Sequence, residues 1–412
     1  MVSGGLLGAQ RDLLDAARGA GDRSRRARAL ELAERALAAV DARDRTREAV
    51  GALDGPAYVF AFGKAAVPMC RGALDAVEVV AGCAVGPSLD DAGALGPIAL
   101  HRGGHPAPRD DAPAIARAML TAAGQVPPGA LALCLASGGG SAMLELPADG
   151  LTLADVRDVA AQVARAGADI AELNAVRIAL SAIKGGGLAR AMAGARVVTL
   201  VVSDVPGHPP SIVASGPTCE PEVGPDALEV VRRYGLLDAL DDRVRARLAA
   251  PRNREPVDAT TRVIADNDRA RRALDVDDRG LLLVGEARSR GAAFAAEPPR
   301  DRAWAAGGET TVTLLGPRGR GGRSLELVLG AIAAGWSRGL LLAFGTDGVD
   351  GDSGYAGALV DPSVVVRATE LGIDPARYLA HHDAASFFDA VGGGLPARPT
   401  GTNVADLCIY VP

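Results

Sequence analysis

The feature that most constrains the fold is the alternation of short apolar runs with longer stretches of helical periodicity. Continuous apolar runs are typical of strands buried on both faces of a sheet, and residues 152–167 (TLADVRDVAAQVARAG) have the spacing of an amphipathic helix. This pattern predicts an α/β fold with a mostly parallel sheet. The expected strands are YVFAF (58–62), LALCLA (131–136), RVVTLVVS (196–203), TRVIAD (261–266), LLLVGEA (281–287), TTVTLLG (310–316), GLLLAFG (339–345) and DLCIYV (406–411).

Length and local composition indicate two domains. A chain of 412 residues is longer than one ordinary hydrophobic core supports. The segment 249–261 (AAPRNREPVDATT) is polar, contains two prolines and follows a charged helical stretch, which is typical of a linker. We therefore expect a first domain over residues 1–250 and a second over residues 256–412.

Charge and hydropathy exclude several classes of partner. The formal net charge is -6, and no basic run is interleaved with aromatic residues, so we expect no nucleic-acid partner. No window reaches the roughly 18 apolar residues of a membrane span. Residues 21–37 indicate a charged amphipathic helix rather than a signal peptide. The five cysteines lack any metal-binding spacing, which favours a reduced, cytoplasmic, soluble protein.

Lysine is rare in this chain. The sequence contains 42 arginines and only two lysines, Lys64 in FGKAA and Lys184 in SAIKGGG, and both lie beside glycine. A compact ammonium on a flexible stem can reach a phosphate through a gap too narrow for a planar guanidinium. Lys64 follows an expected strand, and ligands of α/β sheets bind beyond the carboxyl ends of strands.

The segment SGGGSA, from Ser137 to Ala142, also follows an expected strand. Its successive backbone N–H groups and two hydroxyls suit a phosphate cradle, and a flexible turn is an equally good interpretation. The GxxxxGK[ST] spacing of a Walker loop is absent. A convincing GxGxxG with an acidic residue about 20 positions later is also absent, so the sequence does not support a nicotinamide site.

Acidic residues follow two further expected strands. Asp204 precedes a turn and is a candidate base for a substrate hydroxyl or a magnesium ligand, although a turn-capping role is commoner. The loop GTDGVDGDSG presents Asp347, Asp350 and Asp352 without the spacing of an EF-hand. Binding of a magnesium nucleotide and a ligand-free turn rich in aspartate both remain open.

Basic residues complete the set of candidates. Arg323 lies at an expected helix start after three glycines, where a guanidinium can bind phosphate or carboxylate. The stretch NAVRIALSAIKGGG predicts a helix that ends at the glycines, with Arg177 and Lys184 two turns apart on one face. That face would hold an acceptor carboxylate if it lines a cleft. The helix dipole alone would also favour Lys184 near the helix end.

Ten motifs in one order give the chain a specific resemblance from about residue 55 to the C-terminus. The motifs are FGKAA, GGHPAP, SGGGSAMLELP, LNAVRIALSAIKGG, SDVPG, ASGPT, GGETTVTLLG, GGRSLE, GTDGVDG and PTGTNVADL. Together they resemble the two-domain glycerate 2-kinases that contain a MOFRL domain. The resemblance implies transfer of the γ-phosphoryl group of ATP to the 2-hydroxyl of D-glycerate, with Mg²⁺, to give 2-phosphoglycerate.

The resemblance also implies a fold and a set of site residues. We expect a Rossmann-like α/β/α N-terminal domain, a smaller α/β C-terminal domain of MOFRL type, and an active site in the cleft between them. The expected catalytic residues are Lys64, Asp204 and Arg323. The expected ATP-binding residues are Ser137, Gly138, Gly139, Gly140, Ser141, Gly345, Thr346, Asp347, Thr402 and Asn403; the expected substrate-binding residues are Arg177, Lys184 and His208; and the expected Mg²⁺ ligands are Asp347 and Asp350.

The chain departs from the pattern of these kinases at four motifs. SDVPGHPP replaces SDVPGDD, RIALS replaces RKHLS, GGRSLE replaces GGRNQE, and HHD replaces NND. Because these changes flank the retained Lys64, Asp204 and Arg323, they favour phosphoryl-transfer machinery with an altered acceptor pocket. Three hypotheses follow: a D-glycerate 2-kinase, a kinase for another small hydroxy acid, and a catalytically silent metabolite-binding relative. A homodimer is left open. The departing residues are His208, Pro209, Ile178, Ala179, Ser324, Leu325, His381 and His382.

Overall fold

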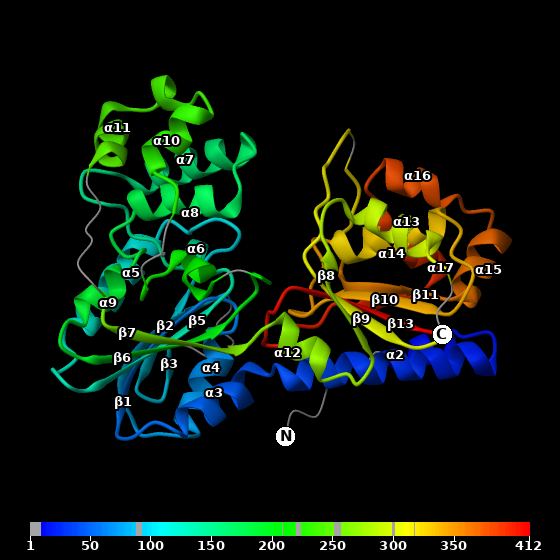
Figure 1. Ribbon diagram of the computed structural model, residues 1–412, viewed down its shortest axis with the longest axis horizontal. Coiled ribbons are helices and arrows are strands. Elements are labelled where there is room, and N and C mark those ends of the chain that lie inside the picture. Colours follow the sequence, from blue (N-terminus) through cyan, green and yellow to red (C-terminus); the bar gives the residue numbers. More distant parts are fainter. Residues whose placement is uncertain are drawn as a thin grey trace. The chain divides into compact units, whose positions relative to one another are not determined.

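The computed structural model describes residues 10–87, 93–207, 209–219, 224–250, 257–298, 301–316 and 318–412. The chain divides into two compact units, each of which contains one sheet (Figure 1). The seven-stranded unit comprises residues 42–203 and 208–264. The six-stranded unit comprises residues 1–41, 204–207 and 265–412.

The seven-stranded sheet has the order β3-β4-β2-β1-β5-β6-β7. Strand β1 pairs in parallel with β2 and β5, and the pairs β2–β4 and β5–β6 are also parallel, whereas the short edge strand β3 is antiparallel to β4. The fully apolar interior strands explain why this sheet could be predicted as parallel. The strands are β1 (Ala57–Phe62), β2 (Val79–Gly86), β3 (Ala94–Leu95), β4 (Ile98–Arg102), β5 (Leu131–Ser137), β6 (Arg196–Val202) and β7 (Ala259–Ala265).

Helices cover this sheet on two sides (Figure 1). The crossover through α4 leads from β1 to β2, and the crossover through α5 leads in the opposite direction from β4 to β5; right-handed connections of opposite direction place their helices on opposite faces. Helices α7, α8, α10 and α11 pack around a separate apolar cluster. The helical elements are α3 (Ala42–Val50), α4 (Ala66–Leu74), α5 (Ala112–Ala123), α6 (Gly140–Met143), α7 (Leu153–Arg165), α8 (Ile170–Ala179), α9 (Gly187–Ala191), η2 (Pro210–Ser215), α10 (Ala227–Arg233), η3 (Leu237–Ala239) and α11 (Asp242–Ala249).

The six-stranded sheet is mixed, with the order β12-β11-β10-β13-β9-β8. All described neighbours pair antiparallel except β8 and β9, so the expectation of a mostly parallel sheet is wrong for this unit. The chain returns directly from β10 to β11 through a loop, and a connection without a crossover helix gives antiparallel neighbours. The strands are β8 (Asp277–Leu283), β9 (Trp304–Gly308), β10 (Leu340–Gly345), β11 (Tyr355–Val360), β12 (Gly394–Pro396) and β13 (Asp406–Val411).

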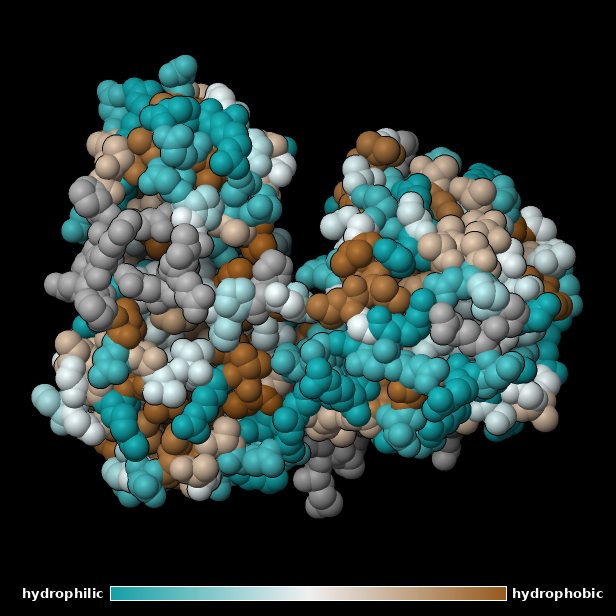
Figure 2. Space-filling model, viewed as in Figure 1, coloured by the Kyte–Doolittle hydropathy of each residue, from teal (hydrophilic) through white to brown (hydrophobic). Residues whose placement is uncertain are grey.

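Helices lie on both faces of the mixed sheet as well (Figure 1). Helix α14 packs on β10 and β11, and α13 packs on α14, while α2 packs on β10 and β13 from the other face. The visible surface over α2 and α12 is mainly hydrophilic (Figure 2), in keeping with the charged outer face of α2. The helices are α1 (Gln10–Asp15), α2 (Ala20–Ala39), α12 (Asn267–Arg272), α13 (Ala287–Ala296), α14 (Arg323–Ala333), α15 (Pro362–Glu370), α16 (Pro375–Ala380) and α17 (Ala384–Val391).

The compact units divide the chain differently from a single cut at residues 249–261. Strand β7 continues the seven-stranded sheet next to β6, so that sheet uses residues beyond the expected linker. Helix α2 belongs to the six-stranded unit, where the buried Arg26 forms a two-pronged ion pair with Asp361 at 2.6 and 3.0 Å. The charged residues of α2 did not reveal in the sequence that Arg26 would pair with Asp361, which lies 335 positions further along the chain.

One expected strand is not formed, and another segment takes its place. Residues 310–316 (TTVTLLG) make only an isolated bridge at Thr311, while the alanine- and glycine-rich segment before them forms β9. Glu286 accepts hydrogen bonds from the Thr313 backbone and hydroxyl, and His382 accepts one from the Leu315 N–H at 3.1 Å. Side chains therefore satisfy backbone groups that a sheet ladder would otherwise use. Among the helices of the described residues, none combines the length and apolar character that crossing a bilayer requires.

Candidate functional site

Two of the sequence-predicted groups meet at the point where the seven-stranded sheet reverses its strand order. From β1 the chain proceeds to β2 on one side, and it later returns to β5 on the other side of β1. In such sheets the carboxyl ends of the two strands at the reversal form the usual ligand crevice. Lys64 follows β1, and Ser137 ends β5, so both lie at this point.

Close backbone approach joins the two segments. The Lys64 N–H donates to Gly138 O at 2.8 Å, and the Ala65 N–H donates to the Ser137 hydroxyl at 3.0 Å. Gly63 has φ +112°, and a Cβ there would lie 2.3 Å from Ser137 O. Only glycine permits this approach, which fixes the backbone from which the Lys64 side chain extends.

The glycine loop 137–142 turns directly into the short helix α6. Gly139 has φ +80°, and a Cβ there would lie 3.1 Å from His105 and 3.2 Å from the Lys64 Cγ. The N–H groups of Gly139, Gly140 and Ser141 make no hydrogen bond to another described residue. Successive N–H groups without acceptors, beside a lysine, are chemically suited to an anion such as phosphate.

A chain of hydrogen bonds supports the far side of this loop. Ser215 donates to Asn174 Oδ1 at 2.8 Å, so its oxygen accepts from the Ser141 hydroxyl at 2.6 Å. Ala214 and Ser215 have φ values of +54° and +59°, which are strained for residues other than glycine. This strain lies in ASGPT, a motif to which the sequence assigned no role, and the contacts show that it positions Ser141.

Lys184 and Arg177 do not share a helix face. Helix α8 ends at Ala179, because Ser181 bridges to Pro147 and donates to Glu145 at 2.7 Å, so the expected continuation to the glycines is wrong. Lys184 forms an ion pair with Glu145, and both side chains are almost completely buried. Burial lowers the pKa of Lys184, and Glu145 opposes that effect. A buried pair of this kind serves the fold rather than direct contact with an acceptor.

The six-stranded unit contains a second charged group, centred on Arg323 at the start of α14. Its Nη2 lies 3.1 Å from Asp406 Oδ1, and its Nη1 pairs with Glu309. Burial acts to lower the pKa of Arg323, but the carboxylates of Asp406, Glu309 and Asp350 outweigh burial and raise it. The glycines before Arg323 singled it out in the sequence, whereas Glu309 and Asp406 lie in the motifs GGETTVTLLG and PTGTNVADL, to which no site role was given for these two acids.

Asp406 and Asp350 are the two almost fully buried acids of this Arg323 cluster (Arg323, Asp406, Glu309 and Asp350), and Asp406 contacts the guanidinium directly. Burial raises its pKa to about 7 although Arg323 acts in the opposite direction. Its Oδ2 has no hydrogen-bond partner among the residues that the structure describes. In the sheet Asp406 pairs with Gly345 on one side and Gly308 on the other, so neither cross-strand partner has a side chain beside it.

The expected magnesium ligands have other partners. Asp350 Oδ1 accepts from the Ser324 N–H at 3.1 Å and Oδ2 from the Leu325 N–H at 2.8 Å, so this carboxylate caps α14. Burial raises its pKa to about 6. Asp347 accepts from the Val349 N–H at 3.1 Å. Across the described ranges, no three His, Cys, Asp or Glu side chains are grouped to hold a metal ion. These donors do not fit a resident Mg²⁺ on Asp347 and Asp350.

The remaining predicted residues of this unit form the loops around β10 and β13. Asp204 Oδ2 accepts from Asn403 at 3.1 Å, which brings two predicted site residues together. Thr346 is fully buried and donates to Ala405 O at 2.6 Å, and Thr402 donates to Val40 O at 2.7 Å. Both threonine hydroxyls therefore hold the chain together. Gly345 ends β10 and pairs with Asp406.

The positions that depart from the kinase pattern are mostly inside the fold. His208 lies outside the described residues. Leu325 and Ser324 are buried in α14, and Ala179 is buried at the end of α8. His382 is buried too and interacts with Glu326 at 3.2 Å. Most of these side chains therefore contact other residues inside the fold. Ile178 lies against Gly185, and His381 is exposed, with its Nδ1 2.8 Å from Arg377 O.

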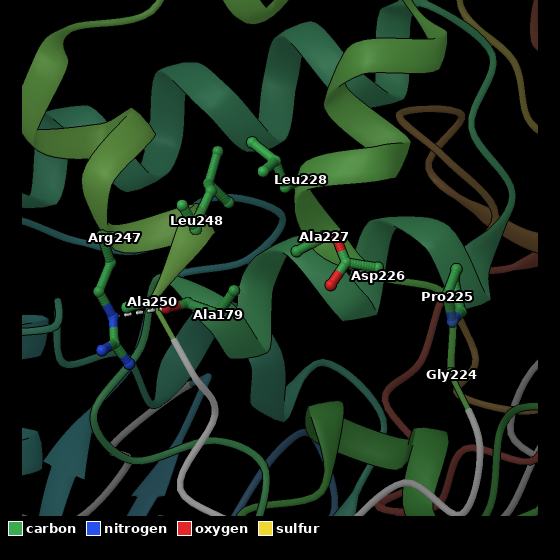
Figure 3. Close-up of a pocket in the computed structure, with 10 residues that line it drawn as sticks. Ala179, Gly224, Pro225, Asp226, Ala227, Leu228, Arg247, Leu248 and Ala250 are labelled. Carbon is green, nitrogen blue, oxygen red and sulfur yellow. Dashed lines mark hydrogen bonds between the residues drawn. The ribbon is translucent and has the colours of Figure 1, made fainter.

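A separate hollow lies among α8, α10 and α11 (Figure 3). Its two charged side chains are engaged locally: Asp226 caps α10 through the Glu229 N–H at 3.0 Å, and Arg247 donates to Ala179 O at 2.8 Å. The hollow therefore presents few polar groups for a ligand. It is lined by Ala179, Gly224, Pro225, Asp226, Ala227, Leu228, Arg247, Leu248, Ala249 and Ala250.

Two family models match the chain in the order expected from its motifs. Residues 28–249 match a domain of unknown function, DUF4147, and residues 302–406 match the MOFRL family. The first match alone spans more than half of the chain.

Curated relatives and solved structures give the same picture. A protein from Agrobacterium vitis with a provisional hydroxypyruvate reductase name is 39% identical over 76% of this chain and 77% of its own length. A glycerate 2-kinase from Pyrococcus horikoshii is 33% identical over 87% of this chain and 88% of its own. The crystal structure of a glycerate kinase from Thermotoga maritima matches with a TM-score of 0.82 and 30% identity, covering 93% of this chain and 98% of that one.

Proposed function

Because the chain belongs to the glycerate kinase family with a DUF4147 region followed by a MOFRL region, we propose that it transfers the γ-phosphoryl group of ATP to D-glycerate. The enzyme is a phosphotransferase with an alcohol group as acceptor. The proposed acceptor atom is the 2-hydroxyl, which gives 2-phosphoglycerate. The cytoplasm is the proposed location, since the five cysteines are free thiols.

One observation carries the proposal. Lys64 and a loop whose N–H groups have no acceptor among the described residues lie together at the strand-order reversal of the seven-stranded sheet. Phosphoryl transfer requires positioning and neutralisation of charge on the phosphates more than covalent chemistry by the protein. The loop supplies backbone dipoles for phosphate oxygens, and Lys64 supplies a positive charge next to them.

The proposed roles of the other residues follow from their contacts. Arg323 binds an anionic group of the substrates, because its guanidinium is half-exposed and held by Asp406. Asp204 remains the proposed base for the acceptor hydroxyl, oriented by Asn403. Arg177 is the remaining proposed ligand for the acceptor carboxylate, since Lys184 is paired with Glu145.

Magnesium enters this proposal as part of the Mg-ATP substrate. Mg²⁺ in kinases is bound largely by substrate phosphates and waters, with one or two carboxylates, rather than by a dedicated protein cage. That chemistry agrees with the lack of a three-ligand metal cluster in the described ranges. No step of the proposal depends on a metal held by the free protein.

The alternative functions differ in the substrates and cofactors that the protein would use. A kinase for another small hydroxy acid would use the same loop and Lys64, and the departures from the kinase motifs, such as SDVPGHPP, are what favours this alternative. The reductase name of one relative implies a nicotinamide cofactor, for which the sequence has no dinucleotide fingerprint. A silent relative would bind metabolites without turnover.

The test is ³¹P NMR of the purified protein with Mg-ATP and D-glycerate. We expect ADP and a phosphomonoester whose coupling identifies phosphate on carbon 2. Efficient turnover, with kcat/KM of roughly 10⁴–10⁸ M⁻¹s⁻¹, supports D-glycerate as the acceptor. Slow turnover of D-glycerate beside fast turnover of another hydroxy acid would favour the second reading. NADH consumption with hydroxypyruvate, without ADP formation, would reject the kinase.

A further inference from the structure

Two carboxylates of unlike character hold Arg323. Asp406 is the first residue of β13, and its side chain is only 5% exposed; Glu309 follows the last residue of β9, and its side chain is 48% exposed. The first contacts Nη2 and the second contacts Nη1. The buried Asp406 therefore holds Nη2 of Arg323 from inside the unit, and the exposed Glu309 covers Nη1.

Asp406 cannot leave its position without disrupting the sheet. Strand β13 is paired on both sides, with β10 and with β9, and Asp406 lies opposite Gly345 and Gly308 in these pairings. Its carboxylate oxygen Oδ1 lies 3.1 Å from the Arg323 guanidinium. An ion pair fixed by a two-sided ladder keeps its geometry when a ligand arrives.

Glu309 is held by far less. Its backbone lies beyond the end of β9, and Arg323 is the only hydrogen-bonding partner of its side chain among the described residues. Half of the side chain faces solvent, so the carboxylate can rotate into water at little cost. An ion pair with an exposed acid of this kind contributes little to stability, because water solvates the released carboxylate well.

Asp406 and Glu309 occupy the guanidinium group to which an anionic ligand would bind. Phosphate and carboxylate ligands bind arginine most strongly through two parallel N–H groups. With Asp406 on Nη2 and Glu309 on Nη1, an anion that binds the adjacent N–H groups of Nη1 and Nη2 competes with these two acids for the guanidinium. Glu309 is the acid that can move.

We propose that Glu309 is a tethered competitor, whose carboxylate occupies Arg323 in the free protein and is displaced by the anionic group of a substrate. This inference rests on the proposed function, in which Arg323 binds such a group. Asp406 is the matching positioning residue. The arrangement sets an affinity threshold, because a weakly bound monoanion competes poorly with a carboxylate that is already attached, whereas a doubly charged phosphate competes well.

The test compares anion binding by wild-type protein, Glu309→Gln and Glu309→Asp. The probes are Mg-ATP and inorganic phosphate, measured by calorimetry and by thermal-shift titration. Glu309→Gln removes the charge, and Glu309→Asp keeps the charge on a side chain one methylene shorter, which no longer reaches Nη1. Both variants should bind phosphate about three- to fivefold more tightly, a change of about 0.7–1 kcal/mol at 1.4 kcal/mol per tenfold.

A double-mutant cycle supplies the matched control. In an Arg323→Met background, Glu309→Gln should no longer change phosphate affinity, since there is no guanidinium to uncover. Tighter binding by the Gln variant alone, persisting without Arg323, would indicate a general field effect and overturn the proposal. Weaker binding by both single variants would show that Glu309 positions Arg323 or binds the ligand itself, and would also overturn it.

Failure of the kinase reaction remains distinguishable from failure of this inference. If wild-type protein consumes no ATP but the Glu309 variants still tighten phosphate binding through Arg323, the proposed function is wrong and the competitor role stands. If wild-type protein phosphorylates D-glycerate and neither variant changes phosphate or Mg-ATP affinity, the function stands and the competitor role is wrong.

Discussion

The surroundings of Lys64 and of Arg323 place a cation for an anionic ligand in two different ways. The backbone of Lys64 lies in a turn between β1 and α4, which glycines and hydrogen bonds to the loop after β5 hold in place. Arg323 lies among the carboxylates of Asp406, Glu309 and Asp350, which come from three other segments. Glycine and backbone contacts fix the chain that carries the first cation, and carboxylate side chains hold the second.

The difference has consequences for how each region tolerates change. A glycine-built site depends on steric space, so an added methyl group damages it while a distant charge has little influence. A site built from paired ions depends on the balance of charges, so removal of one partner leaves a buried charge unpaired. In the seven-stranded unit, Glu145 follows the glycine loop in sequence and is instead paired with Lys184, with both side chains almost completely buried.

The largest effect should come from breaking that sealed pair. Lys184→Met leaves Glu145 buried without its cation, and we expect a loss of about 3–5 kcal/mol in the free energy of unfolding, measured by urea denaturation. Lys184→Met combined with Glu145→Leu should recover most of the loss. If Lys184→Met retains wild-type stability and instead weakens acceptor binding, Lys184 is a substrate ligand. The seven-stranded unit would then also bind its ligand through a paired ion, as the Arg323 cluster does.

The next effect concerns the lysine at the turn. Lys64→Arg keeps the charge but enlarges and flattens the head group where Gly63 and Gly139 leave little room, so kcat should fall by roughly a hundredfold. Steady-state kinetics measures the change, and circular dichroism verifies folding. Lys64→Met should lose at least as much. Near wild-type turnover of the arginine variant would mean that position 64 requires only a positive charge and not the shape of a lysine. The contrast with the Arg323 cluster would then be lost.

A smaller effect should distinguish the Arg323 cluster by its pH dependence. The pKa of Asp406 is raised to about 7 in the folded protein, from an ordinary value of 3.8. As the pH falls through 7, the folded protein binds this proton before the unfolded chain does, so acidification stabilises the fold until the unfolded value is reached.

The Asp406→Asn variant has no carboxyl group at this position and cannot bind that proton. The difference in free energy of unfolding between wild type and Asp406→Asn should therefore shift in favour of wild type by on the order of 1–2 kcal/mol between pH 7.5 and pH 5.5. Urea denaturation at both pH values measures this difference. A pH-independent difference would show that Asp406 keeps an ordinary pKa and that the cluster is not strained by its charges.

The smallest effect uses two glycines with matching backbone. Gly139 and Gly150 have φ values of +80° and +82°, but a Cβ meets His105 and Lys64 at the first position and nothing within 4 Å at the second. Each alanine variant should lose about 1 kcal/mol of stability through backbone strain. Only Gly139→Ala should also reduce the rise in Tm caused by Mg-ATP. An equal ligand response in both variants would remove the loop from the site.

The resemblance found in the motifs is confirmed by the family matches and the relatives, and most strands of the parallel sheet lie where the apolar runs predict them. Local glycine patterns also predicted the turn at Lys64 and the loop after β5, because both depend on residues adjacent in sequence. The strand expected at 310–316 does not form, because residues distant in sequence decide the conformation of this segment. Its backbone groups are bound by Glu286 and His382, which no local pattern reveals.

The sequence by itself determined the family, the α/β class, the parallel sheet and the position of Lys64 beside its glycine loop. These features arise from hydrophobic periodicity and from glycine, whose effects extend only a few residues. Tertiary structure alone decided that Lys184 is sealed by Glu145, that Asp350 caps α14, and that Asp406 and Glu309 divide Arg323 between them. Charge pairing acts through space, so its partners are fixed only when distant segments have packed.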